Sequence, residues 1–352
     1  MSHAEHADVV VIGGGPAGLA SAIEAARRGF DVAVFEPHAS PIDKACGEGL
    51  MPSARALLSE LGIHVDGMLF RGIRYVDALD PKCAAEGTFP FGQGIGVRRT
   101  LLHQAMHARA HALGVRFIEE RIDHVREEKH HIFAGRTRAH WVIAADGLHS
   151  TLRTNLGLTL PPRHPPRFGV RRHFEITPSS AHVEVHFAEG CEAYVTPVNE
   201  HTIGVAFLYS PPARFDVLSR RFPHLHERLA LAPVQSKARG AGPFEQRVRT
   251  RTVGRILLVG DAAGYLDPLT GEGVALGIAA ARAAIDAIAR GAPHRYERDW
   301  QRLTRAHFAL TRMLLDVSRN RRTQKAMIHT LARVPWLFDQ ALGILGGSCP
   351  ES

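Results

Sequence analysis

The amino-acid sequence predicts an α/β fold made of a Rossmann-like domain, an inserted domain with an antiparallel β-sheet, and a C-terminal helical segment. Three observations predict this fold. A strand, a glycine-rich turn, a helix and a second strand follow one another over residues 8–37. Apolar and polar residues alternate between turn signals over residues 169–208, which is typical of antiparallel strands. Residues 292–352 place apolar side chains three and four positions apart, as amphipathic helices do.

Composition narrows the class of protein. The chain has 352 residues, of which 45% are hydrophobic and 22% charged, as in a globular protein with two lobes or one large body with an added layer. It has no apolar run of about 18 residues and no basic-then-apolar leader, so we expect a cytoplasmic protein. The net charge of +8 is spread along the chain without a nucleic-acid module. This favours an anionic cofactor over nucleic acid.

The cysteines and histidines predict no metal site. The four cysteines are scattered along the chain: Cys46, Cys83, Cys191 and Cys349. None belongs to a C-x-x-C pair, so neither a disulfide framework nor a zinc site is indicated. Three histidines recur every fourth residue on a predicted helix and would share one face: His103, His107 and His111. Because no carboxylate or cysteine joins that face, we interpret it as solvated or as an interface.

The stretch DVVVIGGGPAGLASAIEAARRGFDVAVFEP, residues 8–37, predicts a dinucleotide site. Its glycines occupy the G-x-G-x-x-G positions, where the first permits a tight turn, the second lets the backbone approach a pyrophosphate, and the third lets helix pack on strand. Proline suits the helix start because the N–H group that it lacks would have no intrahelical partner there, and the helix dipole favours phosphate at this end. A glutamate at the end of the second strand can accept hydrogen bonds from both ribose hydroxyls. The predicted cofactor-binding residues are Gly13, Gly15, Pro16, Ala17, Gly18 and Glu36.

Three further motifs, together with the first, resemble the FAD-dependent oxidoreductases of the aromatic-hydroxylase (group A flavoprotein monooxygenase) and geranylgeranyl-reductase superfamily, in family order. They are GVRRTLLHQAM (96–106), VIAADGLHSTLR (142–153), and RTVGRILLVGDAAGYLDPLTGEGVALGIAAARAAIDAIARG (251–291). The resemblance covers most of residues 8–290 and implies a FAD-binding domain of the glutathione-reductase type. FAD is therefore the expected cofactor.

The resemblance also implies roles for particular residues. In that family the aspartate of the Gly-Asp pair contacts the flavin ribityl chain, which is Asp261 here. The start of the following helix faces the pyrimidine edge of the isoalloxazine, and it contains Gly271, Gly273 and Val274. Arg99, with Arg98 as second choice, is expected at the pyrophosphate or the ribityl chain.

The stretch DKACGEGLMP, residues 43–52, resembles the Cys-Gly form of the segment that passes beneath the isoalloxazine, and also the Gly-Glu turn of halogenase relatives. The resemblance implies that Cys46 and Gly47 line the flavin pocket. A redox dithiol needs a second cysteine at a short spacing, and Met51 stands there instead. We interpret Cys46 as a compact wall residue; a reactive thiolate, with its pKa lowered by Lys44 or a helix start, stays open as the alternative.

We expect the inserted domain with the antiparallel sheet to hold the substrate. The run AYVTPVNEHTIGVAF resembles a degenerate form of the reductase subfamily's aromatic-x-aromatic-x-x-Pro strand, with Tyr194 retained and Thr196 in place of tryptophan. We expect both residues to contact substrate, and a sheet-core role for Tyr194 stays open. The halogenase signature of two tryptophans before Ile-Pro is missing. The predicted domains are a FAD-binding domain of residues 1–76, 97–168 and 250–290, a substrate domain of 77–96 and 169–249, and C-terminal helices over 291–352.

The predicted reaction is monooxygenation. Because one dinucleotide fingerprint is present, NAD(P)H is expected as a transient donor, with dioxygen forming a flavin C4a-hydroperoxide that oxidises a lipophilic aromatic or polyketide-like small molecule. The alternatives are a geranylgeranyl-reductase-like enzyme that reduces isoprenoid or conjugated double bonds, and a flavin-binding accessory protein without turnover. No triad, metal cluster or paired acid stands out, so no catalytic residue is predicted. We expect the C-terminal helices to pack across the flavin domain rather than to touch a membrane.

Overall fold

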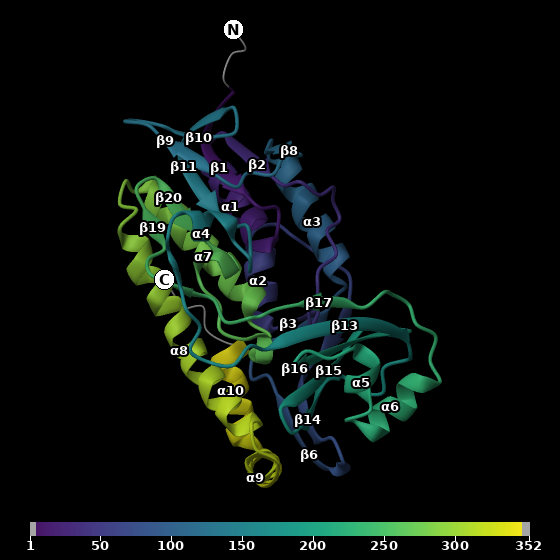
Figure 1. Ribbon diagram of the computed structural model, residues 1–352. Helices are drawn as coiled ribbons and strands as arrows, with labels where there is room; N and C mark the ends of the chain where they lie inside the picture. The colour runs from purple at the N-terminus through teal and green to yellow at the C-terminus, as the bar shows by residue number, and fades with distance from the viewer. Residues whose placement is uncertain (1–4, 347–352) are drawn as a thin grey trace.

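The computed structural model describes residues 5–346, and two β-sheets form its framework (Figure 1). The first sheet has a parallel centre, because its strands are joined by crossover helices. In spatial order its strands are β19 (Thr252–Val253), β20 (Ile256–Leu258), β11 (Thr137–Ala144), β1 (His6–Ile12), β2 (Val32–Phe35) and β8 (Arg116–Ile118). The strands β9 (Val125–Glu127) and β10 (Ile132–Ala134) extend it as an antiparallel hairpin beside β11.

Small residues let two helices of this first domain pack closely. The helix α1 (Pro16–Arg27) follows β1 and packs against α7 (Gly273–Ala289). A Cβ added at Gly277 would lie 3.3 Å from the Cβ of Ala17, so a larger residue there would push the two helices apart. The remaining helices of this part are α2 (Pro52–Glu60), α3 (Arg99–Ala112), α4 (Thr151–Asn155) and the 3₁₀ turns η1 (Gly260–Ala263) and η2 (Pro268–Thr270).

The second sheet is antiparallel except where β14 and β5 pair in parallel. Its strands in spatial order are β17 (Arg239–Ala241), β13 (Phe168–Glu175), β16 (Thr202–Tyr209), β15 (Cys191–Asn199), β14 (His182–Ala188), β5 (Gly72–Asp77) and β6 (Asp80–Thr88). The antiparallel order of β13 to β16 follows the alternation in the sequence. The sheet also includes β5, which begins at Gly72, whereas the predicted substrate domain begins at residue 77. The sequence does not show this difference, because a short apolar run does not reveal which sheet it joins.

Smaller elements connect the two sheets or cover them. A three-stranded sheet lies between them, with the order β3 (Gly49–Leu50), β7 (Gly94–Gly96) and β4 (Met68–Phe70). A two-stranded ladder joins β12 (Thr159–Leu160) to β18 (Arg247–Val248). The short helices α5 (Phe215–Ser219) and α6 (Pro223–Ala230) pack on the second sheet through Phe215 and Leu225.

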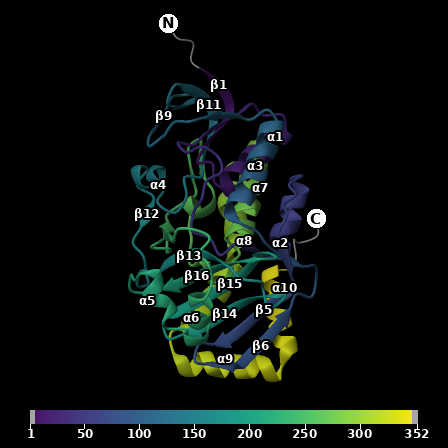
Figure 2. The same cartoon turned by 90° about the vertical axis from the view of Figure 1, so that its right-hand side faces the viewer.

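The C-terminal helices contact the first domain, as expected, and also the second sheet. The helix α8 (Arg295–Ser318) packs against α7, whereas α9 (Arg321–Arg333) and α10 (Pro335–Gly346) pack against β6. Figure 2 shows α9 and α10 beside β5 and β6. Phe338 and Leu342 are buried there in one cluster with Tyr75. No helix among residues 5–346 is both long and apolar enough to cross a membrane.

Candidate functional site

A cavity of about 710 Å³ lies where the first sheet meets the second. Its polar part gathers residues from the carboxyl ends of β1, β2, β11 and β20, the edge at which open α/β sheets bind ligands. Its other wall comes from β5, β14 and β15 of the second sheet. Every residue that the sequence predicts to contact cofactor or substrate lines this cavity except Gly18. A Cβ at Gly18 would lie 1.9 Å from the carbonyl oxygen of Gly13, so Gly18 serves the packing of α1 on the turn.

The glycine turn after β1 is shaped by contacts that exclude side chains. Gly13 has a φ of +107°, and a Cβ there would lie 2.3 Å from the carbonyl oxygen of Ala145. Gly15 differs, because a Cβ there would meet no described atom within 4 Å. It borders open cavity at the start of α1, where the backbone N–H groups and the helix dipole favour a phosphate.

Glu36 is oriented beside this turn. Its Oε2 accepts a hydrogen bond from the N–H of Gly14 at 2.9 Å, and its Oε1 accepts one from the N–H of His38 at 3.1 Å. Burial alone would raise the pKa of Glu36, but these hydrogen bonds outweigh it and hold the pKa below its ordinary value. The carboxylate is therefore charged and fixed at the end of β2, where it lines the cavity.

The histidine stripe on α3 is not a uniform solvated face, which corrects the interpretation from the sequence. His103 is buried, and its Nε2 lies 2.9 Å from the carbonyl oxygen of Gly14 and its Nδ1 3.1 Å from Ser40 Oγ. Burial and the nearby Arg99 lower the pKa of His103 to about 4, so the ring is neutral. His103 thus packs against the glycine turn and contacts its backbone at Gly14. His111, two turns further along, is exposed.

The loop between β2 and β3 crosses the cavity between the two sheets. A Cβ at Gly47 would meet no described atom within 4 Å, and the residue borders the cavity. The carbonyl of Gly47 accepts a hydrogen bond from Thr196 Oγ1 at 2.8 Å. Tyr194 donates its hydroxyl to the carbonyl of Leu269 at 2.6 Å. The polar atoms of the two predicted substrate residues therefore hold backbone of the first domain, while their side chains line the cavity.

Cys46 is a protonated thiol rather than a thiolate. It lines the cavity, and burial raises the pKa of its thiol above the ordinary value, although Arg99 partly opposes this. Lys44, which the sequence suggested as a cause of a lowered pKa, is exposed. The direction of this pKa favours the compact wall residue over the thiolate alternative. Cys83 and Cys191 are free and buried elsewhere, and Cys349 lies outside the described residues.

A buried charge cluster that the sequence did not predict holds this loop. Glu48 has a φ of +62°, which is rare for a residue with a side chain. Its Oε1 accepts a hydrogen bond from the N–H of Arg99 at 3.0 Å, and its Oε2 lies 2.6 Å from Nε2 of His173. Arg171, two residues earlier on β13, pairs with Asp43 at 2.5 Å and lies 3.7 Å from Glu48. The cluster joins the loop, α3 and the second sheet.

Sequence signals for this cluster were weak. Glu48 belongs to the Gly-Glu turn, but Arg99 lies 51 residues away and His173 lies 125 residues away, and residue spacing does not report contacts at such separations. Arg171 and His173 are separated by one residue on β13, which places both on one face of the strand. That spacing predicts a shared face without revealing that the face is buried.

Charged groups on the first domain are left available toward the cavity. Arg99 is 6% exposed, and its Nη1 has no hydrogen-bond partner among residues 5–346. Asp146 uses Oδ2 to accept from the N–H of Leu152, while its buried Oδ1 has no partner in that same part of the chain. Burial raises the pKa of Asp261, and the cations of Lys44, Arg99 and Arg153 oppose the rise. A polar ligand in the cavity would satisfy these groups.

The start of α7 is electrostatically positive toward the cavity. Gly271 and Gly273 line the cavity, while the side chain of Glu272 between them turns to Ser53, whose hydroxyl donates to its Oε2 at 3.3 Å. Burial raises the pKa of Glu272 to about 8. The side chain is therefore neutral at pH 7 and does not cancel the positive end of the helix dipole.

The wall on the side of the second sheet is mostly apolar. Its residues include Ile73, Tyr75, Val183, Val185, Leu208, Phe244, Leu269 and Leu314. Burial raises the pKa of Tyr75 to about 12, so its hydroxyl stays protonated. The cavity thus has a polar half with an available arginine and helix termini, and an apolar half that suits a hydrophobic molecule.

Fold and site together define an architecture typical of dinucleotide-binding oxidoreductases, with residues of both sheets lining one cavity. The residues fit FAD, because open glycine positions border the glycine turn and the loop of Gly47, and because a buried guanidinium nitrogen of Arg99 lacks a partner within residues 5–346. Gly15 and the start of α1 would hold the pyrophosphate, Glu36 the adenosine ribose, and Asp261 the ribityl chain. When bound, FAD supplies two-electron redox chemistry.

Comparison with known proteins agrees with this architecture. Residues 106–293 match the family model described as FAD binding domain, and residues 8–58 match the one described as FAD dependent oxidoreductase. The chain is 28% identical to a menaquinone reductase of Mycolicibacterium smegmatis, over 86% of this chain and 81% of the relative. It is 32% identical to digeranylgeranylglycerophospholipid reductase 1 of Methanopyrus kandleri, over 76% of each chain. The crystal structure of p-nitrophenol 4-monooxygenase from Pseudomonas putida superposes with a TM-score of 0.81 at 19% identity, covering 97% of this chain and 99% of that one.

The chain belongs to the FAD-dependent oxidoreductases of the aromatic-hydroxylase and geranylgeranyl-reductase superfamily. This confirms the family that the sequence motifs indicated, and FAD as the cofactor. The monooxygenase likeness shows the shared fold.

Proposed function

We propose that this protein uses reduced FAD to reduce a carbon–carbon double bond in a lipophilic, isoprenoid-type substrate, with NAD(P)H as the transient electron donor. The observation that carries the proposal is the apolar wall, which continues directly from the polar part of the cavity where FAD binds. Two of the relatives are named as reductases, of menaquinone and of a digeranylgeranyl lipid. An apolar chain fits such a wall because burying it removes hydrocarbon from water.

The chain's own residues would position the reacting partners and keep water out. Thr196 and Tyr194 fix the loop of Gly47 and the turn η2 to the second sheet, so the cavity keeps one shape. Val183 and Val185 supply the apolar surface on β14 against which a substrate can lie. A protonated thiol at Cys46 adds no negative charge to this side of the cavity.

Hydroxylation with NAD(P)H and dioxygen, the reaction expected from the sequence, is the second candidate. The enclosed cavity supports it as well, because oxygen transfer also requires exclusion of water. The two reactions differ in what reoxidises the reduced flavin. In the proposed reaction the substrate alone does so, whereas hydroxylation requires dioxygen.

The experiment is anaerobic reoxidation of the reduced protein. The FAD is reduced under argon with one equivalent of NADPH or dithionite and mixed with a geranylgeranyl lipid that carries no quinone, and the return of oxidised-flavin absorbance is followed. We expect reoxidation by the substrate without dioxygen. Reoxidation that begins when air is admitted and yields an oxygenated product would reject the proposal in favour of hydroxylation, and no substrate dependence in either gas would favour an accessory protein.

A matched pair of variants tests the apolar wall. Val185→Thr keeps the shape of a side chain that lines the cavity, and Val198→Thr makes the same change at a buried position of β15 outside it. We expect a several-fold higher KM for the substrate in Val185→Thr and an unchanged KM in Val198→Thr. Equal KM values in the two variants would remove this wall from the substrate site.

A further inference from the structure

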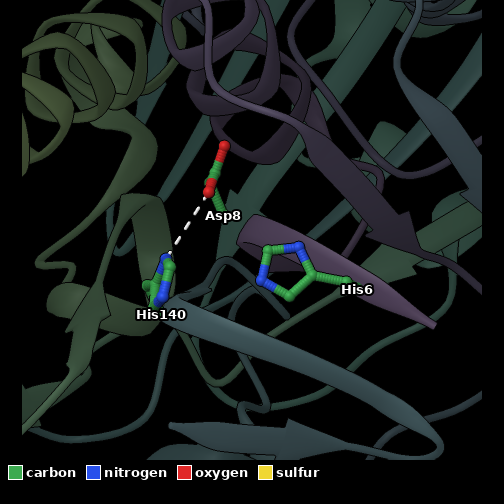
Figure 3. Close-up of side chains that lie close together, drawn as sticks. All are labelled: His6, Asp8 and His140. Carbon is green, nitrogen blue, oxygen red and sulfur yellow. Dashed lines mark ion pairs between the residues drawn. The ribbon is translucent and has the colours of Figure 1, made fainter. Parts of the chain in front are cut away.

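Two histidines and an aspartate meet at the amino end of β1, away from the cavity at its carboxyl end. His6 and Asp8 are separated by one residue on β1, so their side chains share one face of the strand. The neighbouring strand β11 runs parallel to β1, with Ala7 opposite Ala139 and Val9 opposite Trp141. This register places His140 beside Asp8. Figure 3 shows the three side chains facing one another.

The distances suit a common ligand. One nitrogen of each histidine and one carboxylate oxygen of Asp8 all lie within 4.8 Å of one another. Asp8 Oδ1 is 3.5 Å from Nδ1 of His140, and the rings of His6 and His140 are edge to face with centroids 5.5 Å apart. Ligand atoms around a tetrahedral zinc ion are about 3.3 Å apart, given zinc–nitrogen distances of about 2.05 Å. Small side-chain rotations would close the triad to that spacing.

The backbone beneath the triad is rigid, and the carboxylate is oriented. Asp8 Oδ2 accepts a hydrogen bond from the N–H of Asp31 at 2.9 Å, which directs Oδ1 toward His140. Such a hydrogen bond to a ligating carboxylate is typical of metal sites. Ala7 and Val9, which flank Asp8, are fully buried in the core of the sheet. The triad therefore stands on two hydrogen-bonded strands rather than on a loop.

The surroundings favour a metal that prefers nitrogen. Mg²⁺ and Ca²⁺ prefer several oxygen ligands, and Asp8 is the one carboxylate of the triad. Two imidazoles and one carboxylate are instead a ligand set for zinc. His131, the residue before β10, lies near His140 with ring centroids 5.3 Å apart, and its buried Nδ1 has no partner within the described part of the chain. A further nitrogen therefore lies at the edge of the triad.

We propose that His6, Asp8 and His140 form a zinc-binding site that ties β1 to β11 at the edge of the sheet opposite the FAD cavity. The six steps from His6 to Ile12, which lines the cavity, span roughly 20 Å at about 3.3 Å per residue. The site is thus structural and does not supply the reaction. Its side chains are reachable by an ion, because Asp8 and His140 are 34% and 43% exposed. Zinc that binds the folded chain stabilises it by mass action.

The test is titration of the FAD-loaded protein with zinc sulfate, after removal of metals with EDTA, followed by calorimetry. We expect one zinc ion per chain in the wild type and a rise in Tm with zinc. The variants His6→Gln/His140→Gln and Asp8→Asn should each weaken zinc binding at least tenfold, with normal flavin absorbance. Asp8→Asn keeps the hydrogen bond from Asp31 and so covers the case in which the double variant folds poorly.

The control is a His64→Gln/His201→Gln variant, which removes two exposed histidines outside the triad. It should bind zinc as the wild type does. The chain has 22 histidines, and if zinc bound to surface histidines without specificity, both double variants would lose the same amount of zinc binding. Absence of one-to-one zinc binding by the wild type would overturn the proposal. So would equal affinity in the triad variants, the control and the wild type.

Discussion

Gly47 offers a test of where the cofactor lies that separates cavity filling from damage to the fold. A Cβ at this position meets no described atom within 4 Å, so Gly47→Ala and Gly47→Val add groups to the cavity rather than to the packed protein. We expect the free energy of unfolding of the FAD-free protein to change by less than about 0.5 kcal/mol, as for other changes that disturb no packing. Overpacking against a bound ligand costs about 1–3 kcal/mol, which corresponds to a roughly 5–150-fold weaker FAD affinity for valine.

The test needs two measurements, FAD affinity and stability of the FAD-free protein, and the variant Gly13→Ala serves as the comparison. FAD is removed, its affinity is measured by fluorescence quenching, and unfolding of the FAD-free protein is followed in urea. Gly13→Ala should destabilise the fold itself, because Gly13 has a φ of +107° and its Cβ would lie 2.3 Å from the carbonyl oxygen of Ala145. A Gly47→Val protein that binds FAD within twofold of the wild type would refute the reasoning, as would one that has lost stability to the extent of Gly13→Ala.

Four further predictions concern single side chains. Glu36→Ala should weaken FAD binding by about 1.5–3 kcal/mol, the worth of a charge-assisted hydrogen bond, and unchanged affinity would reject its role at the ribose. Asp261→Ala should yield colourless protein with normal far-UV dichroism; a yellow protein with full flavin occupancy would show that the motif has been misread. Cys46→Ser should keep most of the NAD(P)H-dependent turnover, and the contrary result is a variant that binds FAD and is reduced normally yet forms no product. The fourth prediction concerns pH: the folded pKa of Glu272 is about 8, above its ordinary 4.5, so its stabilising effect is present below pH 4.5 and is lost as the pH rises to 8. The stability of the wild type relative to Glu272→Gln should therefore fall by roughly 1.4 kcal/mol per pH unit over that range, and urea midpoints whose difference stays constant from pH 5 to 8 would contradict it.

Local patterns predicted the part of the site that local structure builds. The strand, glycine turn and helix of residues 8–37 form one unit, and Gly13 and Glu36 have the contacts that such a unit requires. The family resemblance, not local spacing, implied Asp261; its turn after β20 lies near the turn after β1 because parallel strands end at one edge of a sheet. Both line the cavity.

The rest of the site depends on contacts between distant segments. Glu48 is held by Arg99 and His173, and no spacing in the sequence reports a pair about 125 residues apart. His103 was placed on a face judged from its own helix, whereas its burial comes from the glycine turn packed above it. Likewise, an amphipathic pattern identified α9 and α10 as helices, but which sheet receives their apolar faces is decided by the tertiary fold.

The central claim, that this flavoprotein reduces a double bond, is tested most directly by the mass of its product. Protein loaded with FAD is incubated with NADPH and a geranylgeranyl lipid that carries no quinone, once under argon and once under ¹⁸O-labelled dioxygen, and the mass of the product is measured by mass spectrometry. The account predicts that two hydrogens are added to the substrate in both gases, without ¹⁸O. A product that carries ¹⁸O and forms in dioxygen alone would contradict it.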